Sequence, residues 1–179
     1  MPLLTTTHIK QIAAKIMADL GAGYSEVCYQ TALFNRLIKI DPSTQKEKTA
    51  QVVYEGEVIG TCRADIVTSE HIIEVKATNS MPPKVIKQIR KYMVNFLASD
   101  MVSRNGIVIN FNQDTEQAEF VILDPVTLEV SAAECKQTRR SSPKLGQPVQ
   151  QETMTEEQLE QIARNRAAAL ARRALCPSQ

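Results

Sequence analysis

The sequence has little of what several common kinds of functional site need. Its 179 residues include no tryptophan, two histidines and four cysteines. The cysteines lie far apart without a Cys-x-x-Cys pair, and no His-Glu-x-x-His motif occurs, so zinc-knuckle and zinc-hydrolase sites have little support. The same spacing speaks against a disulfide framework and predicts a reducing, intracellular environment.

Long apolar runs and a strong net charge are also missing. No stretch approaches the length that spans a membrane, and the N-terminus does not show the basic-then-apolar pattern of a signal peptide. The formal net charge is only +1, so any contact with nucleic acid must come from a local patch. With 43% hydrophobic and 23% charged residues, the composition is typical of a soluble protein with one cored domain and an appendage.

Hydrophobic spacing predicts an α/β domain with a mixed sheet flanked by helices. In the second helix, Val27, Leu33 and Leu37 are among the candidates for the core. Asp124-Pro125 is expected to end the folded domain. The expected helices cover residues 8–20, 25–40 and 84–100, and the expected strands cover residues 46–54, 63–67, 72–77, 106–111 and 118–123. A β-rich run broken by Glu55-Gly56 predicts a hairpin that leads into the strand at 63–67.

Two short strands that follow one another in the sequence bring charged side chains onto one face. Whether they are joined by a tight turn or by a loop between Val67 and Ile72, the register places Asp65 opposite Glu74. Side chains alternate along a strand, so Glu74 and Lys76 share a face. Two interpretations are open. The face is either simply solvated, or it binds a divalent cation for phosphodiester hydrolysis, with the lysine orienting the attacking water.

An Asp followed by an acid-x-Lys on the paired strand resembles the signature of the PD-(D/E)XK nuclease superfamily. The run from Gly23 to Tyr29 resembles the namesake motif of its GxxExxY branch, and Gln88 with Tyr92 resembles the QxxxY pair of RecB-like nucleases. The resemblance covers roughly residues 9–124. It implies a restriction-endonuclease-like fold and a metal-dependent nuclease that uses Mg²⁺ or Mn²⁺. The expected substrate is DNA, in repair, replication or recombination, with RNA as the open alternative.

The same resemblance implies roles for single residues. Asp65 and Glu74 would bind the metal with Glu26 completing the site, although from the residues alone Glu26 is also an acid that complements a helix dipole. Lys76 would position the attacking water, while Gln88 and Tyr92 would support the substrate and the site geometry. Phosphate contacts are expected from five basic side chains: Arg63, Lys84, Lys87, Arg90 and Lys91. For the four on the helix at 84–100, an ordinary solvated helix face is the alternative. The alternative function is a non-catalytic nucleic-acid-binding or adaptor module that retains the nuclease fold.

The last fifty residues differ in character from the rest. Residues 1–130 are expected to form the nuclease-like domain, residues 131–153 a flexible linker, and residues 154–176 a helix that binds a partner or folds back on its own domain. The helix resembles segments of nuclear uracil-DNA glycosylase and the xeroderma pigmentosum group A protein that bind the middle subunit of replication protein A. That resemblance implies recruitment to single-stranded DNA and a nuclear location in a eukaryote or a virus of eukaryotes. The residues that carry it are Gln158, Leu159, Ile162, Asn165, Arg166, Ala169 and Leu170.

Overall fold

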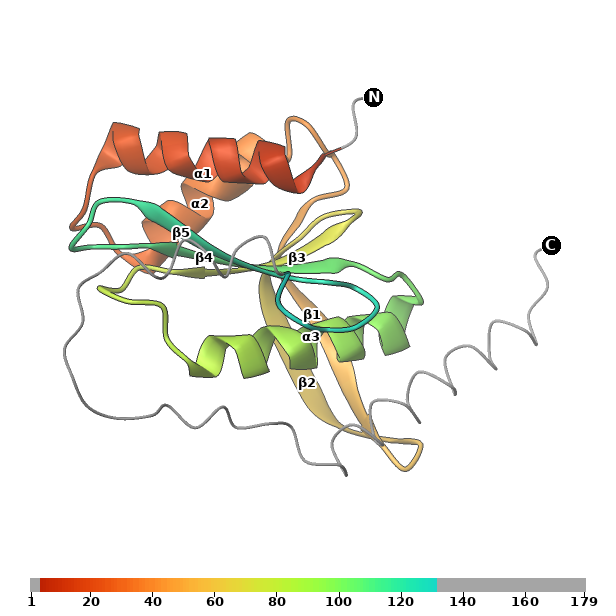
Figure 1. The fold of residues 1–179 in the computed structure, drawn as a ribbon. Coiled ribbons are helices and arrows are strands. Elements are labelled where there is room, and N and C mark those ends of the chain that lie inside the picture. The colour runs from red at the N-terminus through yellow and green to blue at the C-terminus, as the bar shows by residue number, and fades with distance from the viewer. Residues whose placement is uncertain (1–3, 132–179) are drawn as a thin grey trace, which may run out of the picture.

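The computed structural model describes residues 4–131 (Figure 1). The predicted linker and the predicted partner-binding helix, with its replication protein A motif, therefore lie outside the described residues, apart from residue 131. None of the described helices is long and apolar enough to cross a membrane. The elements are α1 (Thr6–Leu20), α2 (Glu26–Leu37), β1 (Gln45–Tyr54), β2 (Glu57–Val67), β3 (His71–Lys76), α3 (Lys84–Asp100), β4 (Asn105–Phe111) and β5 (Ala118–Leu123).

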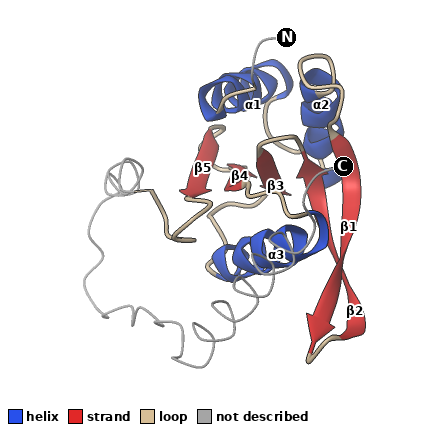
Figure 2. Cartoon of the chain, turned by 90° about the vertical axis from the view of Figure 1, so that its right-hand side faces the viewer, coloured by secondary structure: helices blue, strands red, loops and turns tan. Residues whose placement is uncertain are grey.

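The strands form one mixed sheet in the order β1-β2-β3-β4-β5. Only β3 and β4 run parallel, because α3 connects them, and the other neighbours are antiparallel. Figures 1 and 2 show α1 and α2 on one face of the sheet and α3 on the other. The predicted α/β fold with a mixed sheet between helices is confirmed.

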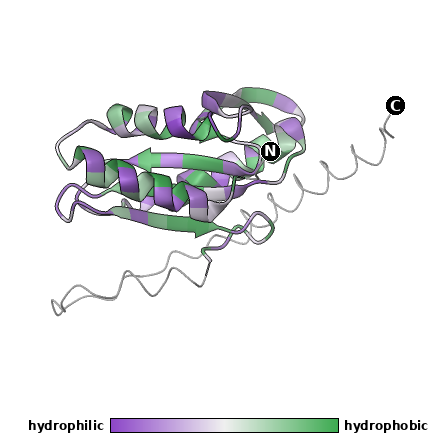
Figure 3. Ribbon diagram, turned by 90° about the horizontal axis from the view of Figure 1, so that it is seen from above, coloured by the Kyte–Doolittle hydropathy of each residue, from purple (hydrophilic) through white to green (hydrophobic). Residues whose placement is uncertain are grey.

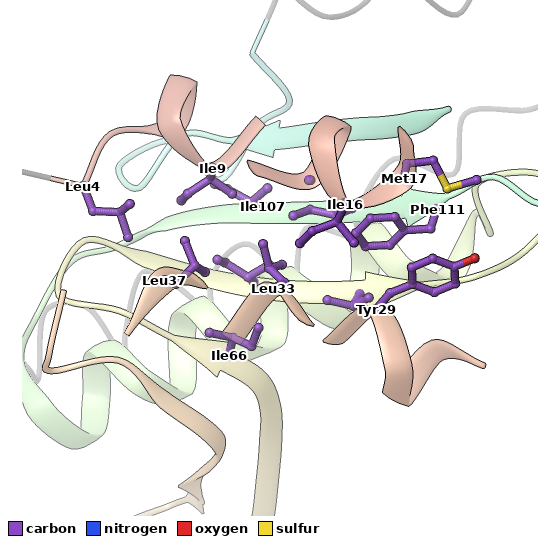
Figure 4. Packing of buried hydrophobic residues seen from close by; sticks show 14 residues of the cluster. Leu4, Ile9, Ile16, Met17, Tyr29, Leu33, Leu37, Ile66, Ile107 and Phe111 are labelled. Carbon is purple, nitrogen blue, oxygen red and sulfur yellow. The ribbon is translucent and has the colours of Figure 1, made fainter. Parts of the chain in front are cut away.

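Each face of the sheet has its own hydrophobic core. Under α1 and α2, side chains such as Ile9, Leu33 and Phe111 are fully buried (Figure 4). Under α3, Ile89 and Phe96 pack on the opposite face of the sheet. The helices alternate hydrophobic and hydrophilic residues (Figure 3), as helices with one face on a sheet do. The central strands β3 and β4 are buried on both faces, which leaves a charged side chain within them without access to bulk water.

The helix α2 presents a different face to the core from the one predicted. Val27 was expected in the core, and that expectation is wrong because its side chain is 61% exposed. Tyr29, Leu33 and Leu37 recur every four residues and fill the buried face, whereas Val27 lies on a flank of the first turn. An apolar side chain is thus left in solvent next to Glu26.

The strands β1 and β2 form a long ribbon that leaves the sheet and passes α3 (Figures 1 and 2). Although β2 has 11 residues, only Ile66 and Val67 pair with β3. The ribbon turns at Glu55 and Gly56, both at positive φ, which is the two-residue hairpin geometry that matches strand twist. The hairpin predicted at Glu55-Gly56 is confirmed. The strand predicted to begin near Arg63 is continuous with the second arm of this hairpin and begins at Glu57, because it pairs with β1 along its full length.

The fold continues beyond Asp124-Pro125, which was expected to end it, and stays within the range 1–130 expected for the domain. The carboxylate of Asp124 accepts hydrogen bonds from the backbone N–H groups of Val126 and Thr127, at 2.7 and 2.8 Å, and turns the chain back. Val130 then forms a β-bridge with Leu123. An aspartate followed by proline marks a turn here, and the chain returns to the sheet after it.

Candidate active site

The fold brings the six predicted catalytic residues together around the C-terminal end of β3. Glu74 and Lys76 lie on β3 itself, and Asp65 lies on β2 where the ribbon separates from it. Glu26 is the first residue of α2, from one face of the sheet. Gln88 and Tyr92 come from α3 on the other face and lie one helical turn apart.

Asp65 is fixed by a backbone contact. The pairs Ile66–Ile73 and Val67–Ile72 give the predicted register. Beyond them the strands part, and Oδ2 of Asp65 accepts a 2.8 Å hydrogen bond from the backbone N–H of Val75. The carboxylate therefore takes the place of a ladder bond. It is also close enough to Glu74 for its charge to raise the pKa of the Glu74 carboxyl.

Glu74 is a buried carboxyl with one oxygen satisfied and one not. The residue is 2% exposed, and its Oε1 lies 2.8 Å from Nζ of Lys76 and accepts a 2.8 Å hydrogen bond from Nε2 of Gln88. Oε2 is buried and accepts no hydrogen bond from any residue between 4 and 131. Burial, and then the charge of Asp65, raise the pKa of Glu74 to about 7, although Lys76 opposes the shift. Burial also raises the pKa of Asp65.

Lys76 connects the carboxylates of two elements. Its Nζ lies 2.8 Å from Oε1 of Glu74 and donates to Oε1 of Glu26 at 3.2 Å and to the carbonyl oxygen of Val75 at 2.9 Å. These three acceptors match the three N–H donors of an ammonium group. Contact with Glu74 and Glu26 raises the pKa of Lys76 even though burial opposes it, so the group is charged at neutral pH.

Gln88 and Tyr92 hold Glu74 from the side of α3. Nε2 of Gln88 donates to Oε1 of Glu74 and also lies 2.7 Å from the hydroxyl oxygen of Tyr92. Burial raises the pKa of Tyr92, so its hydroxyl stays protonated. The pair fixes the orientation of the Glu74 carboxyl from the second face of the sheet.

A known family matches this arrangement. The family model of the PD-(D/E)XK nuclease superfamily matches residues 4–123, about two thirds of the chain. The chain belongs to the PD-(D/E)XK nuclease superfamily. Its members are generally nucleases, which hydrolyse phosphodiester bonds. Asp65, Glu74 and Lys76 follow the order that the superfamily name spells, with Ala64 where the name has proline.

Other comparisons add little to the superfamily match. A search of curated proteins found no match. A solved structure described as the crystal structure of SSO0001 is 14% identical over 68% of each chain, with a TM-score of 0.35. A likeness this low carries no weight for fold or function.

The basic residues predicted to contact phosphate do not all lie together on this PD-(D/E)XK domain. Lys84, Lys87 and Lys91 are exposed and lie within one helical turn of Gln88 on α3, forming what we call the lysine face. Arg90 is two residues from Gln88, about 200° around the helix, and its Nε donates to the carbonyl oxygen of Leu128. Arg63 is exposed on the ribbon, with its guanidinium 3.7 Å from the carboxylate of Glu47.

The predicted set of three metal ligands is only partly assembled. Within residues 4–131, no group of three or more His, Cys, Asp or Glu side chains is arranged to hold a metal ion by itself. Glu26 contacts Lys76, and the carboxyl of Glu74 is electrostatically coupled to that of Asp65. The structure thus presents a pair of carboxyls, Asp65 and Glu74, with Glu26 held beside them through Lys76.

Sequence analysis missed one residue that supports the site. Gln30 is 5% exposed, and its Nε2 lies 3.5 Å from the backbone carbonyl oxygen of Asp65. It lies one helical turn after Glu26, so a search for polar residues four positions from the motif glutamate would have found it.

Proposed function

We propose that this protein is a metal-dependent nuclease that hydrolyses phosphodiester bonds in DNA. The observation that carries the proposal is the buried Oε2 of Glu74, which has no hydrogen-bond partner in the described part of the chain, beside a second desolvated carboxyl, Asp65. An unpaired polar atom in such a place is costly to the fold, so its presence favours a role in binding. Membership of a superfamily of nucleases supports the same conclusion.

The residues present fit a divalent cation. Mg²⁺ takes oxygen ligands and is commonly held by one or two carboxylates, with substrate phosphate and water completing its shell. Asp65 and Glu74 would supply those carboxylates, and the cation would give Oε2 of Glu74 its missing partner. Bound there, Mg²⁺ or Mn²⁺ would polarise the phosphate and lower the pKa of a water.

The other residues of the site would orient the attacking water, hold the Glu74 carboxyl in place and contact the phosphates of the substrate. Lys76 reaches a nucleophilic water only when that water replaces one of its three acceptors. Glu26, whose side chain is 42% exposed and contacts Nζ at 3.2 Å, is the most easily displaced of them. Gln88 and Tyr92 keep the Glu74 carboxyl in place. The lysine face would contact the phosphates of the substrate.

Cleavage of labelled single-stranded, duplex and flapped DNA tests this function. We expect cutting in Mg²⁺ or Mn²⁺ that stops with EDTA and returns when excess metal is added, because the site is incomplete without a cation. The Lys76→Met variant, purified in the same way, is the control for contaminating nuclease. Binding of DNA without cutting under every metal condition would contradict the enzyme and favour the non-catalytic binding module.

The finer proposal concerns recruitment and rests on sequence alone. We infer from the GxxExxY-like motif and the tail that the protein is a GxxExxY-branch nuclease of DNA repair, replication or recombination. In this proposal, residues 158–170 bind the middle subunit of replication protein A in the nucleus. Calorimetric titration of the full chain with the winged-helix domain of that subunit is expected to show binding. Ile162→Asp is expected to abolish it, whereas Gln161→Ala, outside the motif positions, preserves it. Equal binding by both variants would contradict the proposal.

A further inference from the structure

An exposed aromatic and an exposed apolar side chain lie on either side of Glu26. Tyr24 is 50% exposed and Val27 is 61% exposed. Single apolar residues in solvent are ordinary on protein surfaces and need no explanation. These two are close in sequence to a residue that contacts Lys76, so their exposure is next to the candidate active site.

The ring of Tyr24 is supported from beneath. It meets the ring of Tyr29 edge-on, with centroids 6.3 Å apart and planes at 90°. Tyr29 is fully buried, stacks on Phe111 at 4.5 Å (Figure 4), and donates a 2.6 Å hydrogen bond from its hydroxyl to the carbonyl oxygen of Gly21. The loop before α2 is held further by a 2.7 Å bond from the N–H of Gly23 to Oε1 of Gln113. Tyr24 is therefore placed by the core, with half of its surface left open.

The position of this surface suits a nucleic acid strand. Two residues of chain span at most about 7 Å, so the backbone positions of Tyr24 and Glu26 lie within that distance of each other. From the other face of the sheet, α3 brings Gln88 to the same site, and the lysine face lies alongside Gln88. A strand whose phosphates contact the lysines and the metal site would pass Glu26, and its bases would approach the exposed ring of Tyr24.

We propose that Tyr24 forms a stacking platform for an unpaired base next to the scissile phosphate. Val27 lies about 200° around α2 from Tyr29, the residue on which Tyr24 packs, and so is not part of this platform. The substrate class would then be single-stranded, flapped or frayed DNA. Within a duplex, each base is covered on both faces by its neighbours, so the platform can engage only a base that has left the stack. Every base has a π face, so this contact selects for strand structure without selecting for sequence. The inference rests on the proposed nuclease function.

The test uses Tyr24→Ala, the ring-preserving Tyr24→Phe, and Tyr54→Ala as matched control. Tyr54 is 52% exposed at the far end of the ribbon, so its loss removes an equally exposed ring at a distance from the site. We expect Tyr24→Ala to raise KM for single-stranded and flapped DNA roughly 5- to 150-fold. Its kcat should change little, and Tyr24→Phe and Tyr54→Ala should match the wild type.

A second measurement does not depend on cleavage. Single-stranded DNA carrying 2-aminopurine at successive positions is titrated with the full chain in EDTA. Quenching of the probe by the wild type at one or two positions, lost in Tyr24→Ala and kept in Tyr54→Ala, would support the platform.

The outcomes separate this inference from the proposed function. Wild-type protein that neither cuts nor binds any DNA would overturn both. Wild-type cutting with no change in KM or quenching in Tyr24→Ala would overturn the platform alone. Two further outcomes would also overturn the platform. One is an equal rise in KM on single-stranded and duplex DNA in Tyr24→Ala. The other is a melting temperature that Tyr24→Ala lowers and Tyr24→Phe restores, which would show that the ring stabilises the fold of the loop.

Discussion

Asp65→Asn is expected to lower metal-dependent cleavage by at least about 100-fold while leaving the fold intact. The asparagine side-chain oxygen can still accept the hydrogen bond from the N–H of Val75, so the contact that fixes this position is kept. The negative charge that would bind the cation is lost. Rates of cutting under single-turnover conditions measure the effect, and the melting temperature measured in EDTA checks the fold.

Asp114→Asn makes the same chemical change on an exposed turn and is expected to cut at the wild-type rate.

Lys76→Met is expected to reduce cleavage by a factor similar to that of Asp65→Asn, because it removes the charged donor that would orient the attacking water. Cleavage that survives in both Asp65→Asn and Lys76→Met would show that the chemistry lies elsewhere.

The free energy of unfolding is expected to fall as the pH rises from about 4.5 to about 7, because of Glu74. Below this window the carboxyl is protonated in both the folded and unfolded states. Within it the unfolded chain releases its proton first, because burial and Asp65 raise the pKa of Glu74 to about 7 in the folded protein. The loss is complete above about pH 7 and amounts to about 3 kcal/mol.

Urea unfolding of the wild type and of Glu74→Gln across pH 4 to 9 measures this dependence of the free energy of unfolding on pH. The difference in stability between variant and wild type should grow in favour of the variant through the window and be constant on either side. Asp65, whose pKa burial also raises, is present in both proteins, so the difference between them reports Glu74 and its coupling to Asp65. Glu70→Gln, an exposed glutamate four residues earlier, should run parallel to the wild type.

Addition of Mg²⁺ should reverse the loss, because a cation stabilises the charged form of the two carboxyls. At a concentration 100 times its Kd, the gain is about 2.7 kcal/mol. The gain should increase with pH through the same window, because the cation competes with a proton on Glu74. A wild-type protein as insensitive to Mg²⁺ as Glu74→Gln would argue against metal binding at this pair.

The sequence predicted the features of this structure that depend on interactions between residues close together in the chain. Periodicity located α3 and β5 to the residue, because each is bounded by local signals such as Pro83 or Asp124-Pro125. The register between β2 and β3 followed from alternation alone, since any short connection from Val67 to Ile72 preserves it. Both results depend on residues that are neighbours in the chain.

What could not be predicted depends on contacts between distant residues. Val27 and Leu33 have the same hydrophobic character, and only the packing of α2 on the sheet decides which is buried. Arg90 has the same charge as Lys91, but the return of the chain at Leu128 makes it a structural donor. The polar partners that raise or lower the pKa values of Asp65 and Glu74 come from four separate elements, α2, β1, β2 and β3. The six candidate catalytic positions were recognised by resemblance to a family, which supplies the long-range information that periodicity lacks.

The separation of the ribbon from the sheet gives β2 two halves of unequal local stability. A two-stranded ribbon with both edges unpaired is marginal in water, so its tip can open without unfolding of the domain, and its amides should exchange with solvent early. Ile66 and Val67 are anchored in the core and should exchange only with global unfolding. Asp65 lies at the boundary between these halves, with its carboxylate bonded to the stable strand β3. This contact makes Asp65 the point at which opening of the ribbon is expected to stop, so the spacing of Asp65 and Glu74 is kept while the tip moves.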